Sequence, residues 1–216
     1  MKKRSFGKIR KSIISIALCI LLGSLLVGCG GDDNSSDADN MDNSSEPYVV
    51  KLDGVEVKPG QTMVQALADL GFEFSDASGR ELVIDENGGS TMVYANVYDL
   101  TYEAEAMTLY SSIDLLKDGE RVASLSIVND TESEIPLSDC TIVTVNVYTN
   151  DTDYEKVSIE GVAFSNLSAD SLKDALGEPQ TNTESKTEWK RGDYGLQVEY
   201  ENGKVSSIRT NYTGMY

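Results

Sequence analysis

The chain has 216 residues, with 18 basic and 36 acidic side chains, a formal net charge of −18 and no histidine. A protein this negative repels nucleic acid and anionic lipid headgroups, which excludes nucleic-acid readers. The absence of histidine excludes Ser-His-Asp and Cys-His catalysis, histidine metal sites and imidazole acid–base chemistry.

The N-terminal segment has the pattern of an export signal. Six basic residues and no acidic one lie within its first eleven positions, and an apolar run over residues 13–27 follows. This run is shorter than the about 20 apolar residues that a membrane-spanning helix needs, but it suits a signal peptide. We therefore expect the segment to direct export and to be removed afterwards.

The apolar run ends in Leu26-Val27-Gly28-Cys29, which resembles the lipobox of bacterial lipoproteins. In that family the cysteine receives a diacylglyceryl group and the chain is cut just before it, at small residues. The resemblance implies a signal peptide over residues 1–28 and a lipid anchor on Cys29. The alternative is an ordinary cleaved signal with an incidental cysteine.

Residues 29–46 are predicted to form a lipidated cysteine followed by a disordered acidic linker. Residues 30–46 contain six acids and no basic residue, and they have too few apolar side chains to offset the entropy of ordering. The remaining residues, 47–216, hold 12 basic and 30 acidic side chains. Only the two acyl chains would hold such a domain at a membrane, so we expect an extracytoplasmic, lipid-anchored protein. The lysine-rich start and the Asn/Asp/Ser linker favour a Gram-positive cell surface.

A first half is predicted over residues 47–150. Apolar residues alternate on both sides of Asp53-Gly54, which is typical of a two-residue β-hairpin. A short helix with Thr62 as its cap follows and ends at Gly71. Further strands are expected over residues 91–98, 121–128 and 141–148, and residues 99–118 fit either a strand or a helix.

A second half, over residues 151–216, repeats this plan. A hairpin at Glu160-Gly161 precedes a short helix with Ser168 as its cap and Gly177 after its end, and strands follow over residues 187–190, 195–200 and 205–209. The turn glycines of the two halves are 107 residues apart. The sequence therefore predicts an α+β fold of antiparallel β-sheets with short packed helices, in two related hairpin-helix-sheet halves.

The C-terminal part resembles a known family of small lipoproteins. Leu176-Gly177-Glu178-Pro179, Trp189 and the strand hairpin over residues 196–205 are similar to SmpA/OmlA (BamE)-type domains, and to the tandem architecture of β-lactamase-inhibitor-protein-like domains. The resemblance implies an α+β architecture that binds protein partners through a sheet face or loops, without catalysis. This chain is longer and more acidic than BamE-type lipoproteins, so their assembly-factor role is not carried over.

Two kinds of acidic cluster were considered as sites. Glu103 with Glu105, and Asp85 with Glu86, are the carboxylate pairs available for glycoside hydrolysis. The acidic runs over residues 150–155 and 85–88 offer oxygen ligands of the type that calcium takes, but neither has EF-hand spacing. We interpret these residues as solvated acids and polar turns, and we expect no catalytic residue, no resident metal and no cofactor.

The candidate binding face is aromatic. Tyr94 and Tyr98 share one side of a predicted strand with Asn96 between them, and Trp189 offers a further aromatic ring. If the alternate valines and Ala95 pack on a helix, this side faces a partner. The alternative places the tyrosines at the rim of the core with only their hydroxyl groups in water.

Cys140 is the one cysteine left after the signal peptide and the lipid anchor are accounted for, and we expect it to be buried and inert. The sequence thus favours a membrane-anchored, non-catalytic module that binds a protein or a cell-wall ligand. The alternative is a carboxylate-dependent hydrolase that acts on envelope glycans.

Overall fold

The computed structural model describes residues 45–84, 86–94, 96–149 and 156–215. These described residues belong to one compact unit. The described residues form mostly antiparallel β-sheet with two short α-helices, which confirms the predicted combination of antiparallel sheets and packed helices. The signal peptide, the lipobox with Cys29 and the linker up to residue 44 lie outside the described residues, as does the boundary at residue 150 between the predicted halves.

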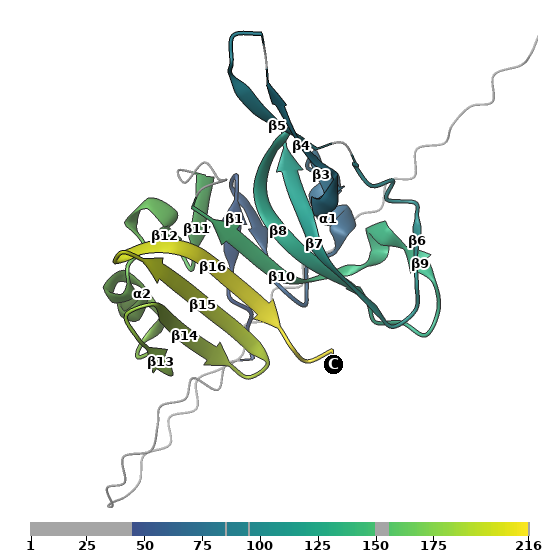
Figure 1. Cartoon of the computed structure of the whole chain (residues 1–216). Helices are drawn as coiled ribbons and strands as arrows, with labels where there is room; N and C mark the ends of the chain where they lie inside the picture. Colours follow the sequence, from purple (N-terminus) through teal and green to yellow (C-terminus); the bar gives the residue numbers. More distant parts are fainter. Residues whose placement is uncertain (1–44, 85, 95, 150–155, 216) are drawn as a thin grey trace, which may run out of the picture. The chain divides into compact units, whose positions relative to one another are not determined.

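An eight-stranded antiparallel sheet is the main element of the fold (Figure 1). Its strands, in spatial order, are β13 (Thr181–Asn182), β14 (Lys186–Arg191), β15 (Tyr194–Glu201), β16 (Lys204–Tyr212), β10 (Thr141–Tyr148), β8 (Glu120–Asn129), β7 (Thr108–Lys117) and β3 (Phe72–Asp76). Residues 99–118, which fitted either a strand or a helix, contain β7 and the two-residue strand β6 (Glu103–Ala104), which pairs with β9 (Ile135–Pro136).

The two faces of this sheet differ in chemistry because successive side chains of a strand point to opposite faces. One row of paired residues is mainly apolar and buried: Ile113, Leu125, Val145, Thr210, Leu196 and Trp189. The neighbouring row is polar across all eight strands: Ser75, Asp114, Ser124, Asn146, Arg209, Gln197, Glu188 and Thr181. The apolar face therefore packs on the core, and the second is a polar face.

A four-stranded sheet is built from the two predicted hairpins. Its order is β12 (Val162–Ala163), β11 (Val157–Ile159), β1 (Val50–Leu52) and β2 (Val55–Val57). Both turns have positive φ at their two central residues, 50° and 78° at Asp53-Gly54 and 47° and 81° at Glu160-Gly161. This is the conformation of a type I′ turn, so the sequence prediction of two tight hairpins is confirmed.

The helices α1 (Val64–Ala68) and α2 (Ala169–Leu176) follow these hairpins, as predicted. Ser168 caps α2 in a capping box with Ser171, with distances of 3.0 and 2.9 Å. The predicted cap of α1 is wrong: Met63 occupies the cap position without a side-chain bond. The Thr62 hydroxyl instead accepts a hydrogen bond from the Lys58 backbone amide at 2.9 Å.

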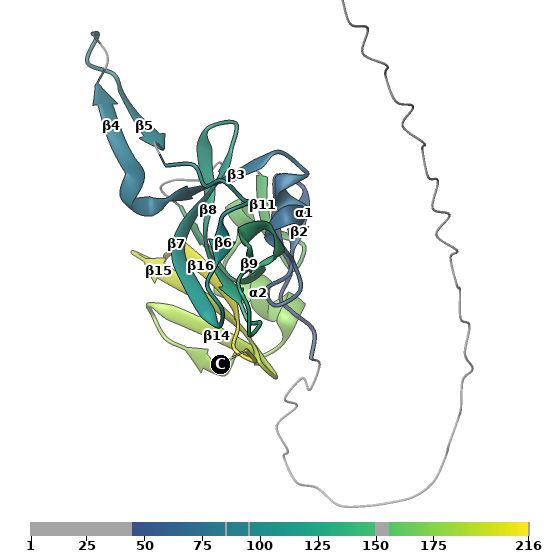
Figure 2. The same ribbon diagram turned by 90° about the vertical axis from the view of Figure 1, so that its right-hand side faces the viewer.

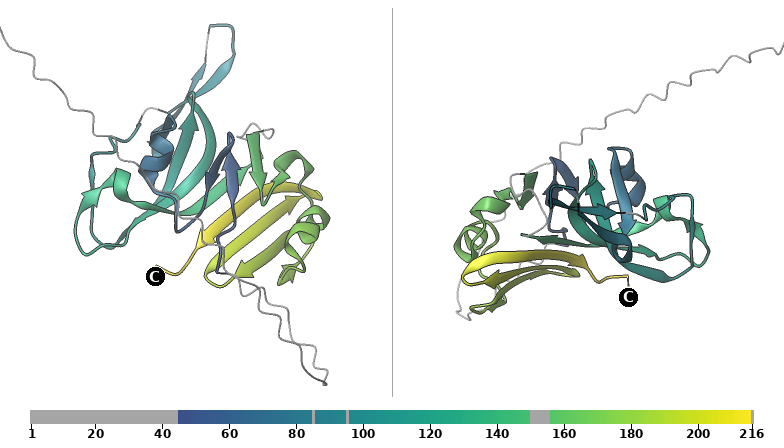
Figure 3. Two further views of the ribbon diagram at one scale, coloured as in Figure 1. Left: turned by 180° about the vertical axis from the view of Figure 1, so that it is seen from behind. Right: turned by 45° about the horizontal axis from the view of Figure 1, so that its top comes forward.

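Both sheets and both helices contribute to a single hydrophobic core. Its largest fully buried side chains are Tyr48, Phe74, Leu52, Leu67, Ile113, Leu115, Leu125, Ile127, Leu137, Ile142 and Ile159. Figure 3 shows the helices and the small sheet on one side of the long strands. Within the part of the chain that the structure describes, no helix has both the length and the apolar character needed to cross a membrane.

Candidate functional site

A β-hairpin projects from the edge of the large sheet (Figures 1 and 2). It consists of β4 (Arg80–Ile84) and β5 (Ser90–Tyr94), which we call the projecting hairpin. Its strands pair in register from Arg80 opposite Tyr94 to Ile84 opposite Ser90. Among the described residues, β4 and β5 form a sheet with each other alone. A two-stranded hairpin has little stability by itself, so it must be held by contacts with the rest of the domain.

The projecting hairpin exposes apolar side chains on both of its faces. Leu82, Ile84 and Met92 lie on one face and are 60%, 67% and 44% exposed; together they are the apolar hairpin face. Val83 and Val93, on the opposite face, are 47% and 41% exposed. A cluster of exposed apolar residues on an element that adds nothing to the core is typical of an interaction site.

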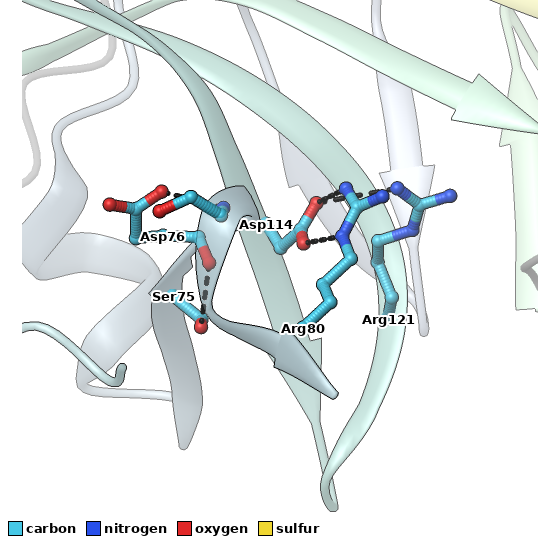
Figure 4. Close-up of polar contacts among 6 residues, drawn as sticks. Ser75, Asp76, Arg80, Asp114 and Arg121 are labelled. Carbon is cyan, nitrogen blue, oxygen red and sulfur yellow. Dashed lines mark hydrogen bonds and ion pairs between the residues drawn. The ribbon is translucent and has the colours of Figure 1, made fainter. Parts of the chain in front are cut away.

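The base of the hairpin is anchored to the polar face of the large sheet by charge-assisted hydrogen bonds (Figure 4). Arg80 donates from Nε to Oδ2 and from Nη2 to Oδ1 of Asp114, both at 2.6 Å. Arg121, on β8, donates to the same Oδ1 at 3.3 Å and lies 5.5 Å above the Tyr148 ring. Asp114 is fully buried, so this bidentate pair determines where the hairpin leaves the sheet.

A second set of contacts positions the hairpin from the chain on either side of it. The Asp76 carboxylate accepts a hydrogen bond from the Ser78 amide at 2.8 Å, and this bond lowers the pKa of Asp76. On the return segment, Val97 bridges to Ser75 on β3. The Tyr98 amide then donates to the Phe74 carbonyl at 2.7 Å. Both ends of the hairpin are therefore tied to β3, the edge strand of the large sheet.

The predicted tyrosine face is divided by this arrangement. Tyr94 ends β5 opposite Arg80, whereas Tyr98 lies beyond the strand, and both are half-buried with a pKa raised by desolvation. Asn96 is exposed. The condition for that face, that the valine side packs on a helix, is not met, because Val93 and Val97 are 41% and 49% exposed. In the described part of the chain, β4 and β5 form a two-stranded sheet of their own. Ala95 lies outside the described residues.

Trp189 is separated from the tyrosines and is not available to a partner. It lies on β14, near the opposite end of the large sheet from β3, and is only 3% exposed. Its indole Nε1 donates to the Gly177 carbonyl at 3.0 Å and so joins the sheet to the end of α2. This burial removes Trp189 from the candidate binding face.

Three of the four carboxylates considered for hydrolysis lie in the described part of the chain, and all three are on the surface. Glu86, Glu103 and Glu105 are exposed, and Asp85 lies outside the described residues. A shallow cavity of about 350 Å³ on the polar face contains Glu188, but Glu188 pairs with Lys186 at 2.9 Å. The hydrogen bond from Lys186 lowers the pKa of Glu188, whereas a general acid needs a raised one.

No group of three or more possible metal-ligating side chains occurs in the described part of the chain. The acidic run over residues 150–155, considered for calcium, is outside that part. Cys140 is fully buried, as expected, and burial raises the pKa of its thiol to about 11.

The projecting hairpin was not predicted from the sequence as an exposed element. The signal was available in two short apolar runs, over residues 82–84 and 92–94, on either side of an Asn-Gly-Gly turn. Comparisons of the chain with protein-family models, characterised proteins and solved structures give no match.

Proposed function

We propose that the chain is a membrane-anchored, extracytoplasmic lipoprotein that acts as a non-catalytic protein-binding module. The observation that carries this proposal is the projecting hairpin, whose apolar face is exposed while its base is held by the hydrogen bonds of Arg80 to the buried Asp114 carboxylate. An anchored base presents the apolar face in one orientation, which lowers the entropy cost of binding. The lipobox supports the anchor, and the lowered pKa of the ion-paired Glu188 does not suit a general acid.

Anchoring and binding are tested separately. Cys29→Ser in the full chain should move the protein from the membrane fraction to the soluble fraction, and retention in membranes would contradict the anchor. For binding, the chain from Gly30 onward is immobilised and exposed to envelope extract, beside a matched variant with Leu82, Ile84 and Met92 replaced by serine. We expect a protein that the parent retains and the variant does not. Equal retention of every protein by both chains would contradict the role of the hairpin.

We also infer that the fold consists of two related halves. Its support is that β1 and β11 pair with Lys51 opposite Ser158, which are 107 residues apart, as are the turn residues Gly54 and Gly161. The two hairpins therefore pair at equivalent positions of the two halves, as two copies of one unit would. An experimental structure with β1 and β11 in another register would contradict this duplication.

A further inference from the structure

We propose that the partner of the projecting hairpin is a protein with an apolar groove bordered by basic residues, into which the apolar hairpin face inserts. This inference rests on the proposed function and adds the chemistry of the partner to it. The apolar hairpin face, Leu82, Ile84 and Met92, is on the same side of the hairpin as Arg80, because alternate residues of a strand share a face. The hairpin face that Arg80 anchors at its base is therefore the face that exposes Leu82 and Ile84 toward the turn.

The border of this apolar face is acidic. Glu86 in the hairpin turn and Glu120 at the start of β8, whose charge acts on Tyr94 on the same face of the hairpin, are both exposed, whereas Glu81 lies on the opposite face with Val83. Arg80 is the one basic residue between positions 80 and 94, and its guanidinium is engaged by Asp114. An apolar centre with a charged border is the arrangement of a protein interface, and an acidic border is complementary to a basic one.

The same charges disfavour two other binding modes of an exposed apolar hairpin, insertion into a membrane and docking against a second copy of the chain. Insertion into the membrane that carries the anchor would bring Glu86 against anionic headgroups and would desolvate its carboxylate. Docking against a second copy would bring two domains with 12 basic and 30 acidic residues each into contact, acidic border to acidic border. A basic partner has neither penalty.

The test uses the full-length chain in the bacterium that produces it, with p-benzoylphenylalanine placed at Leu82. A matched control carries this photo-reactive residue at Lys173, an exposed position on α2 away from the hairpin. After irradiation we expect a protein adduct from position 82 and not from position 173. The cross-linked peptide should be apolar with lysine or arginine close by on the surface.

Charge is tested on the same adduct. Glu86→Lys combined with Glu120→Lys should reduce the yield of the adduct by about tenfold or more, and Glu86→Gln with Glu120→Gln by less. Raising NaCl from about 0.05 M to about 0.5 M in isolated envelopes should also reduce it, because salt screens charges at an exposed border. A protein adduct that is unchanged by charge reversal and by salt would overturn the basic partner but leave the proposed function standing.

The remaining outcomes would identify a second copy of the chain or the membrane as the binding partner. An adduct of two copies of this chain, or of the chain with lipid, would overturn the inference. The chain from Gly30 onward is also tested against phosphatidylcholine vesicles with and without phosphatidylglycerol, where we expect no binding. Binding to either kind of vesicle that is lost when Leu82 is replaced by serine would assign the hairpin to the membrane. Equal adduct yields from positions 82 and 173 would overturn the proposed function itself.

Discussion

Arg80 and Asp114 are 34 residues apart in the chain and form a bidentate pair with two hydrogen bonds of 2.6 Å. The pair joins the projecting hairpin to the polar face of the large sheet. Asp114 has no exposed surface, whereas the Arg80 side chain is 33% exposed. The carboxylate is thus the buried member of the pair, and Arg80 with Arg121 compensates its charge.

Asp114→Ala should therefore lower the free energy of unfolding by about 3 kcal/mol. Removing one member of a buried ion pair costs about 3–5 kcal/mol, and the low end applies because water can reach Arg80. Urea unfolding of the chain from Gly30 onward, followed by circular dichroism, measures the change. Asp114→Asn, which keeps the shape but not the charge, is the control. A loss below about 0.5 kcal/mol in Asp114→Ala would show that the pair does not hold the hairpin.

Replacing the apolar hairpin face should change surface chemistry without changing stability. With Leu82, Ile84 and Met92 replaced by serine, the free energy of unfolding should stay within about 0.5 kcal/mol, since all three residues are exposed on the surface. Binding of the dye anilinonaphthalene sulfonate to the folded chain should fall in the same variant, because the dye binds exposed apolar surface. Leu115→Ala, at a fully buried position, is the matched control and should cost about 2–5 kcal/mol. A large loss in the serine variant would mean that the face is part of the core.

Trp189 gives a direct optical test of the packing between α2 and β14. It is the one tryptophan of the chain and is buried, so its emission should be blue-shifted in the folded protein and shift to the red on unfolding. The fluorescence transition in urea should coincide with that of circular dichroism if the core is one cooperative unit. Trp189→Phe should cost about 1 kcal/mol through loss of the hydrogen bond to Gly177, measured by circular dichroism. Two separate transitions would contradict a single core.

The elements that the sequence predicted well are those that local chemistry determines. Asp53-Gly54, Glu160-Gly161 and Asn202-Gly203 all adopt positive φ at both residues, which few other dipeptides do easily. Ser168 caps α2 because its hydroxyl lies within reach of the Ser171 amide. Each of these features depends on a few neighbouring residues, so a short stretch of sequence suffices to predict it.

The elements that were missed depend on contacts between distant residues. Thr62 has a hydroxyl that could cap a helix, as Ser168 does. In the folded chain this hydroxyl instead accepts a hydrogen bond from the Lys58 amide, which a turn brings close to it. Alternation over residues 91–98 correctly indicates extended chain, yet it does not tell whether a layer covers the valines. That depends on the anchor between Arg80 and Asp114, which no local pattern encodes. The candidate site is therefore the part of the fold that could be predicted least well from the sequence.

The thiol of Cys140 provides a last prediction, on pH dependence. The chain from Gly30 onward contains this one cysteine, so a thiol reagent such as dithiobis-nitrobenzoate should react with no thiol in the folded protein and one in urea. Burial raises the pKa of Cys140 from 9.0 to about 11, and the fold therefore favours the neutral thiol. Its contribution to stability is complete below pH 9 and is lost as the pH rises from 9 toward 11. Relative to Cys140→Ala, in which all other groups titrate alike, the stability advantage of the parent chain should shrink over that interval. An advantage that stays constant or grows would show that the folded thiol ionises as easily as the unfolded one.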